Sequence, residues 1–292
     1  MARSELVTLW ETLNRSISEV DLIRCHCDEA VDLLECHACG FQFFDPRMAG
    51  DEKFYHSLDV GADLYYNKSR PEFKVAITLA KKRGYSTVFD IGCGSGSFLD
   101  LSKKSGLETF GLELNTGAAD EAGAKGHQIW KALIDDTFAL AHCGKYDLVT
   151  LFQVMEHVSQ PVELLTKASE LLTQRGSLMI SVPNRQGTYK LFPLDPHQWP
   201  PHHVSRWRAE DFKKLATEAN LKLESISGDP THGSDLSDRF NANEAMKKAL
   251  GEPPSAVPAT LVRSIAFLYR KLGLKYAVKN CGTSIYATYS RK

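Results

Sequence analysis

A short apolar run that leads into three alternating glycines constrains the fold of this chain more than any other feature. Residues 88–91 predict a buried parallel strand, and Gly92, Gly94 and Gly96 follow it. Glycine adopts positive φ angles readily and lets a ligand lie directly against the backbone. Residues 97–105 then predict a helix, whose free N–H groups favour a polar or anionic group at its start. We therefore expect a nucleotide-like cofactor at this turn.

The spacing of the turn distinguishes between two classes of cofactor. The dinucleotide fingerprint is G-x-G-x-x-G, whereas here Asp90 precedes three glycines at alternate positions. A carboxylate would repel a pyrophosphate and attract an ammonium group, which S-adenosylmethionine carries beside its sulfonium. The turn resembles the first motif of class I S-adenosylmethionine-dependent methyltransferases. This resemblance implies that Asp90 lies near the methionine end of the cofactor, backed by Gly92, Cys93 and Gly94, with Gly96 completing the turn.

Strand and helix patterns alternate regularly after the turn. Apolar runs at residues 88–91, 109–114, 127–130, 146–151 and 177–182 predict strands with helices between them. This alternation favours a parallel sheet with helices on both faces, and two more strands are predicted at 221–227 and 283–289. The resemblance implies an α/β, Rossmann-like fold with seven mostly parallel strands, the last of them antiparallel.

The ends of the second and third strands supply the expected remainder of the cofactor site. Glu113 lies about twenty residues beyond the turn, where a carboxylate accepts both ribose hydroxyls in related folds. Leu114 follows it, and the resemblance places the adenine against Ala132 and Leu133. A solvated loop acid at Glu113 and an ordinary strand-to-helix turn at 131–136 are the alternatives.

The fourth strand runs into a segment, 151–161, with the sequence LFQVMEHVSQP. It resembles methyltransferases related to the ubiquinone-biosynthesis O-methylation enzymes, which implies that Phe152 and Gln153 lie beside the sulfonium. Glu156 and His157 would then line the substrate side or start the next helix. Some of those enzymes hold a divalent cation with two glutamates and a histidine across this segment. Gln153 stands where the first glutamate would be, and because an amide binds a hard cation more weakly, we predict no catalytic metal.

Two other segments are expected to contact the ligands. A loop rich in Pro, His and Trp at 193–207 resembles one that covers the active site in the family, and it makes His203 the candidate base, with His202 and His157 as further candidates and His197 in reserve. The alternative for His203 is that it only fixes the loop by hydrogen bonding. Tyr66 and Arg70 precede a predicted helix at 72–82. The resemblance implies that this stretch lies across the cofactor, so that Tyr66 and Arg70 contact the methionine carboxylate or the acceptor; a helix that only packs on the sheet is the alternative.

Four cysteines near the N-terminus form two close pairs, Cys25 with Cys27 and Cys36 with Cys39. The second pair has Cys-x-x-Cys-Gly spacing, which is typical of a zinc knuckle. It resembles the small zinc-ribbon segment that precedes many methyltransferases of this group. We predict structural zinc on these four cysteines, although the first pair departs from the pattern, so that His26 or His37 could replace a thiolate. A metal-free cluster is the alternative.

These motifs divide the chain into a main domain with additions. We predict a zinc-ribbon-like segment at 1–50, a helical lid or linker at 51–85 and the methyltransferase domain at 86–292. An insertion at about 228–282 is longer than ordinary connections and should cover the substrate side.

Charge and hydropathy limit the partners of the chain. Its 35 basic and 36 acidic residues give a net charge of -1, which argues against a nucleic-acid partner. We expect a cytoplasmic protein, because no apolar run approaches the length of a membrane span and the first twenty residues do not resemble a signal peptide. Residues 259–292 lack acids and include an amphipathic basic helix. Peripheral membrane contact is one explanation for that helix, and docking on the core is the other.

Taken together, the motifs predict an S-adenosylmethionine-dependent methyltransferase that methylates an oxygen, rather than a nitrogen or carbon, of a small-molecule, sugar or lipid-like acceptor. One alternative is an RNA methyltransferase that uses the zinc segment to bind nucleic acid. The fourth strand argues against the broader nucleic-acid classes, because it ends without Asn/Asp-Pro-Pro-Tyr or Pro-Cys. A cofactor-binding protein without catalytic activity is the other alternative.

Overall fold

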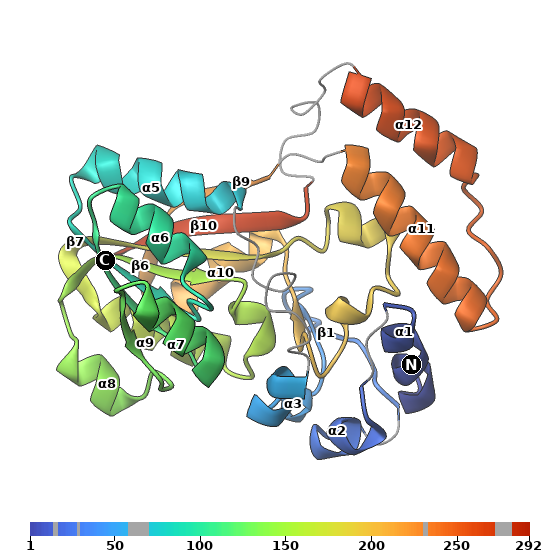
Figure 1. The fold of residues 1–292 in the computed structure, drawn as a ribbon, viewed down its shortest axis with the longest axis horizontal. Coiled ribbons are helices and arrows are strands. Elements are labelled where there is room, and N and C mark those ends of the chain that lie inside the picture. The colour runs from blue at the N-terminus through green and yellow to red at the C-terminus, as the bar shows by residue number, and fades with distance from the viewer. Residues whose placement is uncertain (14–16, 28–29, 58–69, 230–232, 272–281) are drawn as a thin grey trace.

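A seven-stranded sheet forms the centre of the computed structural model, which describes residues 1–13, 17–27, 30–57, 70–229, 233–271 and 282–292 (Figure 1). The strand order is β5-β4-β3-β6-β7-β10-β9. The strands are β3 (Thr87–Ile91), β4 (Glu108–Leu112), β5 (Gln128–Trp130), β6 (Tyr146–Phe152), β7 (Leu172–Pro183), β9 (Leu221–Gly228) and β10 (Ser284–Arg291). β10 pairs antiparallel with both β7 and β9, while β3, β4, β5, β6 and β7 are mutually parallel. The predicted α/β, Rossmann-like sheet is confirmed.

Helices cover both faces of this sheet because its central strands are apolar on both sides. Val88 and Leu148 face a cluster that contains α5 (Pro71–Arg83) and α6 (Ser97–Lys104). Their neighbours Phe89 and Val149 point to the opposite cluster, as the alternation of side chains along a strand requires. That cluster contains side chains of α8 (Asp136–Ala141), α9 (Pro161–Glu170) and α10 (Ala209–Glu218). α7 (Thr116–Ala124) lies next to β5.

The N-terminal segment is joined to the main domain by a second, smaller sheet. β1 (Leu34–Glu35) pairs with β2 (Gln42–Phe43), and β2 pairs with β8 (Ser205–Arg206), which directly precedes α10. The segment also contains α1 (Arg3–Glu11), α2 (Glu19–Arg24), the 3-10 helix η1 (Pro46–Met48) and α3 (Glu52–Ser57). Trp10, Leu22, Phe44 and Phe54 fill an apolar cluster between them. The segment is therefore packed against the loop that carries the predicted histidines.

The predicted insertion forms a helical hairpin beside the main domain (Figure 1). α11 (Gly233–Ala249) and α12 (Ala259–Lys271) pack against each other, and α11 also contacts α1. Met246 of α11 joins Leu9 and Leu194 in a small apolar cluster. Leu194 lies in the long loop after β7, which contains the 3-10 helices η3 (Thr188–Leu191) and η4 (Pro196–Gln198). The hairpin is thus anchored over the loop at one edge of the cavity described below.

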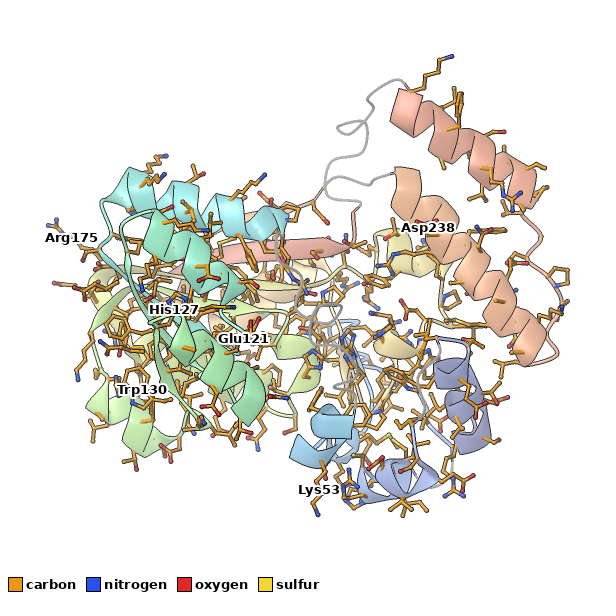
Figure 2. All side chains as sticks on the ribbon, in the orientation of Figure 1. Lys53, Glu121, His127, Trp130, Arg175 and Asp238 are labelled. Carbon is orange, nitrogen blue, oxygen red and sulfur yellow. The ribbon has the colours of Figure 1, made fainter. Side chains whose placement is uncertain are left out.

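The side chains of the described residues divide between packed layers and surface (Figure 2). Trp130 packs between Phe110 and Phe138 at the β5 edge, whereas Lys53, Arg175 and Asp238 are exposed. No helix among the described residues is long and apolar enough to span a lipid bilayer.

Candidate functional site

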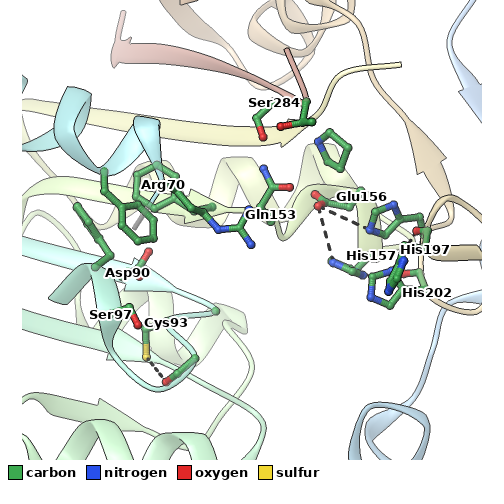
Figure 3. Close-up of a pocket in the computed structure, with 18 of the residues that line it drawn as sticks. Arg70, Asp90, Cys93, Ser97, Gln153, Glu156, His157, His197, His202 and Ser284 are labelled. Atoms are coloured by element: carbon green, nitrogen blue, oxygen red, sulfur yellow. Dashed lines mark hydrogen bonds and ion pairs between the residues drawn. The ribbon is translucent and has the colours of Figure 1, made fainter. Parts of the chain in front are cut away.

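A cavity of about 420 Å³ opens at the carboxyl ends of β3 and β6 (Figure 3). The turn after β3 forms one end, and the 3-10 helix η2 (Met155–His157) and the loop after β7 form the other. Six of the predicted cofactor residues line it: Asp90, Gly92, Cys93, Gly94, Phe152 and Gln153. The three predicted catalytic histidines, His157, His202 and His203, line it too. One cavity therefore brings the two groups of predicted residues together.

The glycines of the turn allow its backbone conformation and leave room for neighbouring side chains. Gly92, Gly94 and Gly96 all have positive φ angles. The N–H groups of Gly92 and Cys93 both donate to the carbonyl of Leu112, which fixes the turn against β4. A Cβ on Gly92 would lie 2.6 Å from a methyl group of Val154. Gly96 does not line the cavity; a Cβ there would lie 3.0 Å from the His127 ring.

Replacement of Gly92 by alanine should weaken cofactor binding, and Gly84 offers a matched control. Both residues have φ near +70°, so each substitution costs about 1 kcal/mol of stability through backbone strain. Only Gly92→Ala also displaces Val154 beside the cavity, whereas a Cβ on Gly84 meets nothing within 4 Å. We expect calorimetric titration with S-adenosylhomocysteine to show weaker binding for Gly92→Ala and unchanged binding for Gly84→Ala. Equal affinities would mean that the turn does not contact the cofactor.

Asp90 is a buried carboxylate at the base of the cavity. It is 3% exposed, and its Oδ1 accepts a hydrogen bond of 2.6 Å from the Thr150 hydroxyl. Burial raises the pKa of Asp90 to about 7; the Thr150 hydrogen bond opposes this rise, and the charge of Glu113 adds to it. A carboxylate in such surroundings favours a cationic partner, because a nearby positive charge stabilises its ionised form.

The pKa of Asp90 predicts how cofactor affinity changes with pH. If the ammonium group of the ligand binds ionised Asp90, affinity rises as pH increases through the pKa of the unliganded protein. We expect the dissociation constant of S-adenosylhomocysteine to fall about tenfold from pH 6 to pH 7.5. Thr150→Val removes a hydrogen bond that favours the ionised form of Asp90. This variant should therefore move the rise in ligand affinity to higher pH. A flat profile in the wild type would rule out this pairing.

Glu113 holds the glycine turn in the described structure. Its Oε2 accepts a hydrogen bond of 2.7 Å from the Gly94 N–H, and its Oε1 accepts one of 2.8 Å from the Asn115 N–H. Burial raises the pKa of Glu113. The residue does not line the cavity, and neither do Leu114, Ala132 and Leu133. Leu114 follows Glu113 just after β4, and Leu133 lies shortly after β5. Both side chains are exposed. Tyr66 lies outside the described residues.

Gln153 is held in an unusual backbone conformation where β6 ends. Its φ angle is +58°, a region that non-glycine residues seldom adopt and that is common at functional sites. Its side-chain amide donates to the Ser181 hydroxyl over 3.1 Å, and that hydroxyl donates to Oε1 of the buried Glu72 over 3.1 Å. Because the amide nitrogen is bound in this way, the carbonyl oxygen of Gln153 is left for the cavity.

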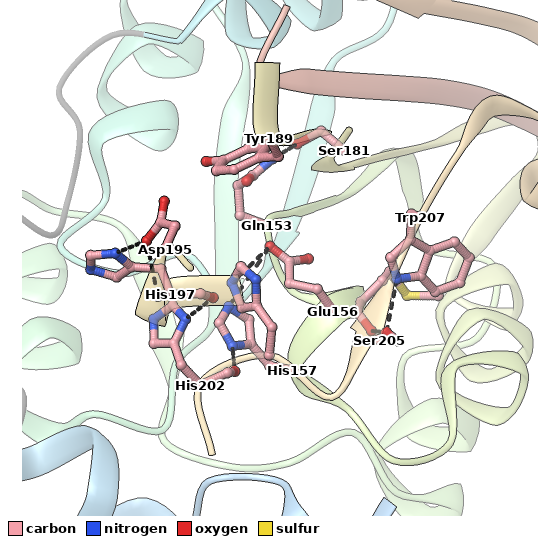
Figure 4. A network of polar contacts seen from close by, with 12 residues as sticks. Gln153, Glu156, His157, Ser181, Tyr189, Asp195, His197, His202, Ser205 and Trp207 are labelled. Carbon is pink, nitrogen blue, oxygen red and sulfur yellow. Dashed lines mark hydrogen bonds and ion pairs between the residues drawn. The ribbon is translucent and has the colours of Figure 1, made fainter. Parts of the chain in front are cut away.

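Three histidines are packed together at the other end of the cavity (Figure 4). The ring centroids of His157 and His203 lie 4.7 Å apart, and those of His202 and His203 lie 4.5 Å apart. His202 and His203 are almost fully buried. Burial lowers the pKa of His157 to about 4 and holds the pKa of His203 well below its ordinary value. The rings of His157 and His203 lie beside the acid Glu156.

Glu156 is the least expected feature of this end of the cavity. It is 1% exposed, and neither of its carboxylate oxygens has a hydrogen-bond partner in the described part of the chain. Its Oε1 lies 3.8 Å from Nε2 of His157 and 3.9 Å from Nε2 of His203. Burial raises the pKa of Glu156 to about 8. A buried carboxyl group without partners is costly, which is typical of a site that a ligand completes.

Residues far apart in sequence close the cavity, and the sequence analysis identified only Arg70 and His197 among them. Arg239 of α11 lies with its guanidinium 4.2 Å from the centre of the Tyr189 ring and 3.2 Å from Oδ2 of Asp195. Asp195 also accepts a hydrogen bond from the His197 backbone. Arg70 lines the cavity as well. The sequence around Arg239 gives no signal of this role, because the contacts of Arg239 with Tyr189 and Asp195 depend on how α11 packs.

The four cysteines predicted to bind zinc lie in two different surroundings. Cys25 and Cys27 are buried in the apolar cluster around Trp10, where burial raises the pKa of Cys25. Cys36 and Cys39 lie in a partly exposed turn before β2. Within the described residues, the one group of three or more potential ligands is formed by His157, His202 and His203. The described residues therefore do not bring the four cysteines together as one group of potential ligands, and structural zinc stays a prediction.

Comparison with known proteins yields a consistent set of relatives. The family model described as "Methyltransferase domain" matches residues 66–226, which is more than half of the chain. The ubiquinone biosynthesis O-methyltransferase of Psychrobacter cryohalolentis is 25% identical over 149 residues, 49% of this chain and 58% of that protein. The enzyme of the same name from Paraburkholderia xenovorans is 27% identical over 157 residues, 49% of this chain and 67% of that protein. This chain thus spans little more than half the length of the first of these relatives.

Solved structures show the same fold at low sequence identity. A SAM-dependent methyltransferase from Archaeoglobus fulgidus is 18% identical, with a TM-score of 0.50 over 78% of this chain and 98% of that one. Another from Thermotoga maritima is 14% identical, with a TM-score of 0.51 over 82% of this chain and 97% of that one. These similarities support the sheet topology described above.

Proposed function

This chain belongs to the methyltransferase-domain family and is an S-adenosylmethionine-dependent methyltransferase, and we propose that it methylates an oxygen atom of a small acceptor bound against Glu156 and His203. The observation that carries this proposal is the single cavity with two chemically different ends. One end has a glycine turn and a buried acid, and the other has imidazoles and a carboxyl group without partners.

The cofactor end suits the methionine portion of S-adenosylmethionine. Asp90 faces the ammonium group, the backbone of Gly92 and Gly94 lies along the ligand, and Arg70 is placed to meet the carboxylate. Glu113 keeps the turn in place through Gly94 and retains lone pairs for the ribose hydroxyls. Leu114, Ala132 and Leu133 then flank the adenine. The sulfonium would lie between Phe152, Gln153 and the acceptor end.

Methyl transfer from a sulfonium is an in-line displacement, so the protein mainly aligns the two reactants. The acceptor oxygen attacks the methyl carbon as the carbon–sulfur bond breaks, and S-adenosylhomocysteine leaves with the electron pair. The hydroxyl proton needs a base, and a neutral imidazole supplies one. Burial keeps the His203 ring neutral. The ionised form of Glu156, whose Oε1 lies 3.9 Å from Nε2 of His203, would stabilise the imidazolium that forms.

A small acceptor fits the dimensions and the closure of the cavity better than a macromolecule does. The acceptor end is bounded by the loop after β7 and by Arg239 of the α11–α12 hairpin. The two curated relatives described above are named as O-methyltransferases of ubiquinone biosynthesis, which supports a hydroxylated small molecule as acceptor. We propose the same division of the chain as before, into three parts with one insertion: residues 1–50, 51–85 and 86–292, with the insertion at 228–282.

Methyl transfer from isotope-labelled cofactor tests this function. The full chain is incubated with S-adenosyl-L-[methyl-¹³C]methionine and with separate pools of hydroxylated aromatics, sugars, amines and total RNA. We expect new ¹³C signals of O-methyl groups only with hydroxylated small molecules. N-methyl signals would assign a nitrogen acceptor, and label in RNA would favour the nucleic-acid alternative; either result would overturn the proposal. Binding of the cofactor without transfer to any pool would also contradict it.

A further inference from the structure

Glu72 of α5 is a buried acid that methyl transfer, as described above, does not use. It is 1% exposed, and its Oε2 has no hydrogen-bond partner among the described residues. Burial raises the pKa of Glu72; the charge of Arg70 and the hydrogen bond from Ser181 oppose this rise, and the charge of Asp229 adds to it. A buried acid with an unpartnered oxygen costs folding free energy, and such acids gather at functional sites.

Two consecutive hydrogen bonds connect Glu72 to the wall of the cavity. Nε2 of Gln153 donates to the Ser181 hydroxyl over 3.1 Å, a bond that Figure 4 shows. The hydroxyl donates its own hydrogen to Oε1 of Glu72, also over 3.1 Å. Ser181 is fully buried in β7, and of these three residues Gln153 alone lines the cavity. The acid therefore reaches the cavity only through the amide of Gln153.

The direction of these bonds determines which end of the Gln153 amide faces the cavity. A hydroxyl has a single hydrogen, and Ser181 gives it to Glu72, so towards Gln153 it can only accept. The amide NH2 group therefore points to Ser181, and the carbonyl oxygen points away from it. Without the acid, the hydroxyl could donate to that carbonyl oxygen instead, and the amide would turn over. The two orientations have almost the same shape, so Glu72 is the group that distinguishes them.

The backbone holds Gln153 in place for this role. Its N–H donates to the carbonyl of Ser181 over 2.8 Å, so main chain and side chain are bonded to the same residue. Its φ angle of +58° is one that a non-glycine residue keeps only where the surrounding structure imposes it. In the view of Figure 3, Gln153 lies between Asp90 and Glu156, which line the same cavity.

We propose that Glu72 is a positioning residue that, through Ser181, holds the carbonyl oxygen of Gln153 towards the sulfonium and its methyl group. This inference rests on the proposed function, which places the sulfonium beside Gln153. A carbonyl oxygen carries partial negative charge and attracts a positive group, whereas the NH2 end of the amide would repel it. S-adenosylhomocysteine is neutral at its sulfur, so this arrangement favours the charged methyl donor over the product.

Paired titrations with two cofactor analogues test this role without relying on activity. Sinefungin carries a protonated amine where the methyl donor has its sulfonium and methyl group, and S-adenosylhomocysteine has no charge there. The two ligands share the methionine ammonium group, the ribose and the adenine. The ratio of their dissociation constants, measured by calorimetry on the full chain, therefore isolates the group that faces Gln153. We expect the wild type to bind sinefungin more tightly.

Glu72→Met and Ser181→Ala should each lower this preference about tenfold, because each removes one bond that orients the amide towards a charged group. The affinity for S-adenosylhomocysteine should stay within about twofold in both variants. Ser177→Ala is the matched control. It removes another buried serine hydroxyl from β7, which lies 2.8 Å from the Tyr85 hydroxyl, and it should leave the preference unchanged.

A double variant separates positioning from general support of the fold. Gln153→Ala removes the amide and keeps a Cβ at the same φ angle, so it should itself lose the preference. In that background Glu72→Met should have no further effect, because the acid acts through the missing amide. Thermal unfolding should show Glu72→Met to be at least as stable as the wild type, since an apolar chain replaces a buried acid.

The preference of the wild type and its response to the variants decide the outcome. A wild type without a preference for sinefungin would overturn the role of Gln153. A preference that survives both Glu72→Met and Ser181→Ala, or an effect of Glu72→Met that persists with Gln153→Ala, would overturn the role of Glu72. If Glu72→Met does not fold, Ser181→Ala supports or overturns the inference by the same measurement. These titrations measure binding alone, so they can fail while label transfer succeeds, and the reverse.

Discussion

Asp90→Asn should raise the dissociation constant of S-adenosylhomocysteine about 100-fold or more, which corresponds to about 2.7 kcal/mol. The substitution keeps the shape of the side chain but removes the negative charge that faces the ammonium group. The loss is large because Asp90 is buried, and a charge-assisted hydrogen bond screened from water is stronger than one on the surface. Asp90→Ala should behave in the same way.

The control for this experiment is an acid that is far from the cavity. Asp136 begins α8, and its side chain is 93% exposed. Asp136→Asn should leave ligand binding unchanged. Thermal unfolding should show that Asp90→Asn is at least as stable as the wild type, because the substitution removes a carboxylate whose ionised form is costly to bury. If calorimetry gave the same affinity for Asp90→Asn and the wild type, the turn would not bind the methionine end.

His203→Ala should lower kcat at least about 100-fold while the affinity for S-adenosylhomocysteine stays within twofold. General bases commonly contribute this much. The separation between kcat and affinity follows from the structure. His203 lies beside Glu156 and His157, and Figure 3 shows these two residues at the opposite end of the cavity from Asp90. Steady-state kinetics with the acceptor found by label transfer, together with calorimetry, would measure both quantities.

A histidine outside the cavity provides the comparison. His37 is exposed in the turn before β2, and His37→Gln should leave kcat unchanged. Glu156→Gln should lower kcat as His203→Ala does, because it removes the only acid beside the His203 ring in the described structure. If His203→Ala retained more than half of the wild-type kcat, the ring would only fix the loop by hydrogen bonding, which was the alternative for this residue.

The sequence predicted the sheet and the conformation of the glycine turn well because their signals are local. A buried strand followed by Gly92, Gly94 and Gly96 needs only neighbouring residues to specify its conformation, and all three glycines have the positive φ angles that the pattern requires. The antiparallel last strand came from the family resemblance and is present as β10.

The acceptor end was only partly predictable, because it depends on contacts between distant segments. The Glu156-His157 pair was recognised, but the lack of hydrogen-bond partners for the Glu156 carboxylate among the described residues depends on the loop at 188–203 that covers it. Arg239 reaches the cavity from an insertion whose helices carry no motif. The zinc prediction relied on the spacing of Cys25, Cys27, Cys36 and Cys39, and spacing does not specify that the first pair points into an apolar cluster.

A crystal structure of the chain with S-adenosylhomocysteine is the most direct test of the central claim that one cavity joins the cofactor and the acceptor. We predict the ammonium group within hydrogen-bond distance of Asp90, the ribose on Glu113, and the sulfur between Gln153 and Phe152, facing Glu156 and His203. A ligand bound elsewhere, or a sulfur atom that faces away from the histidines, would contradict the claim.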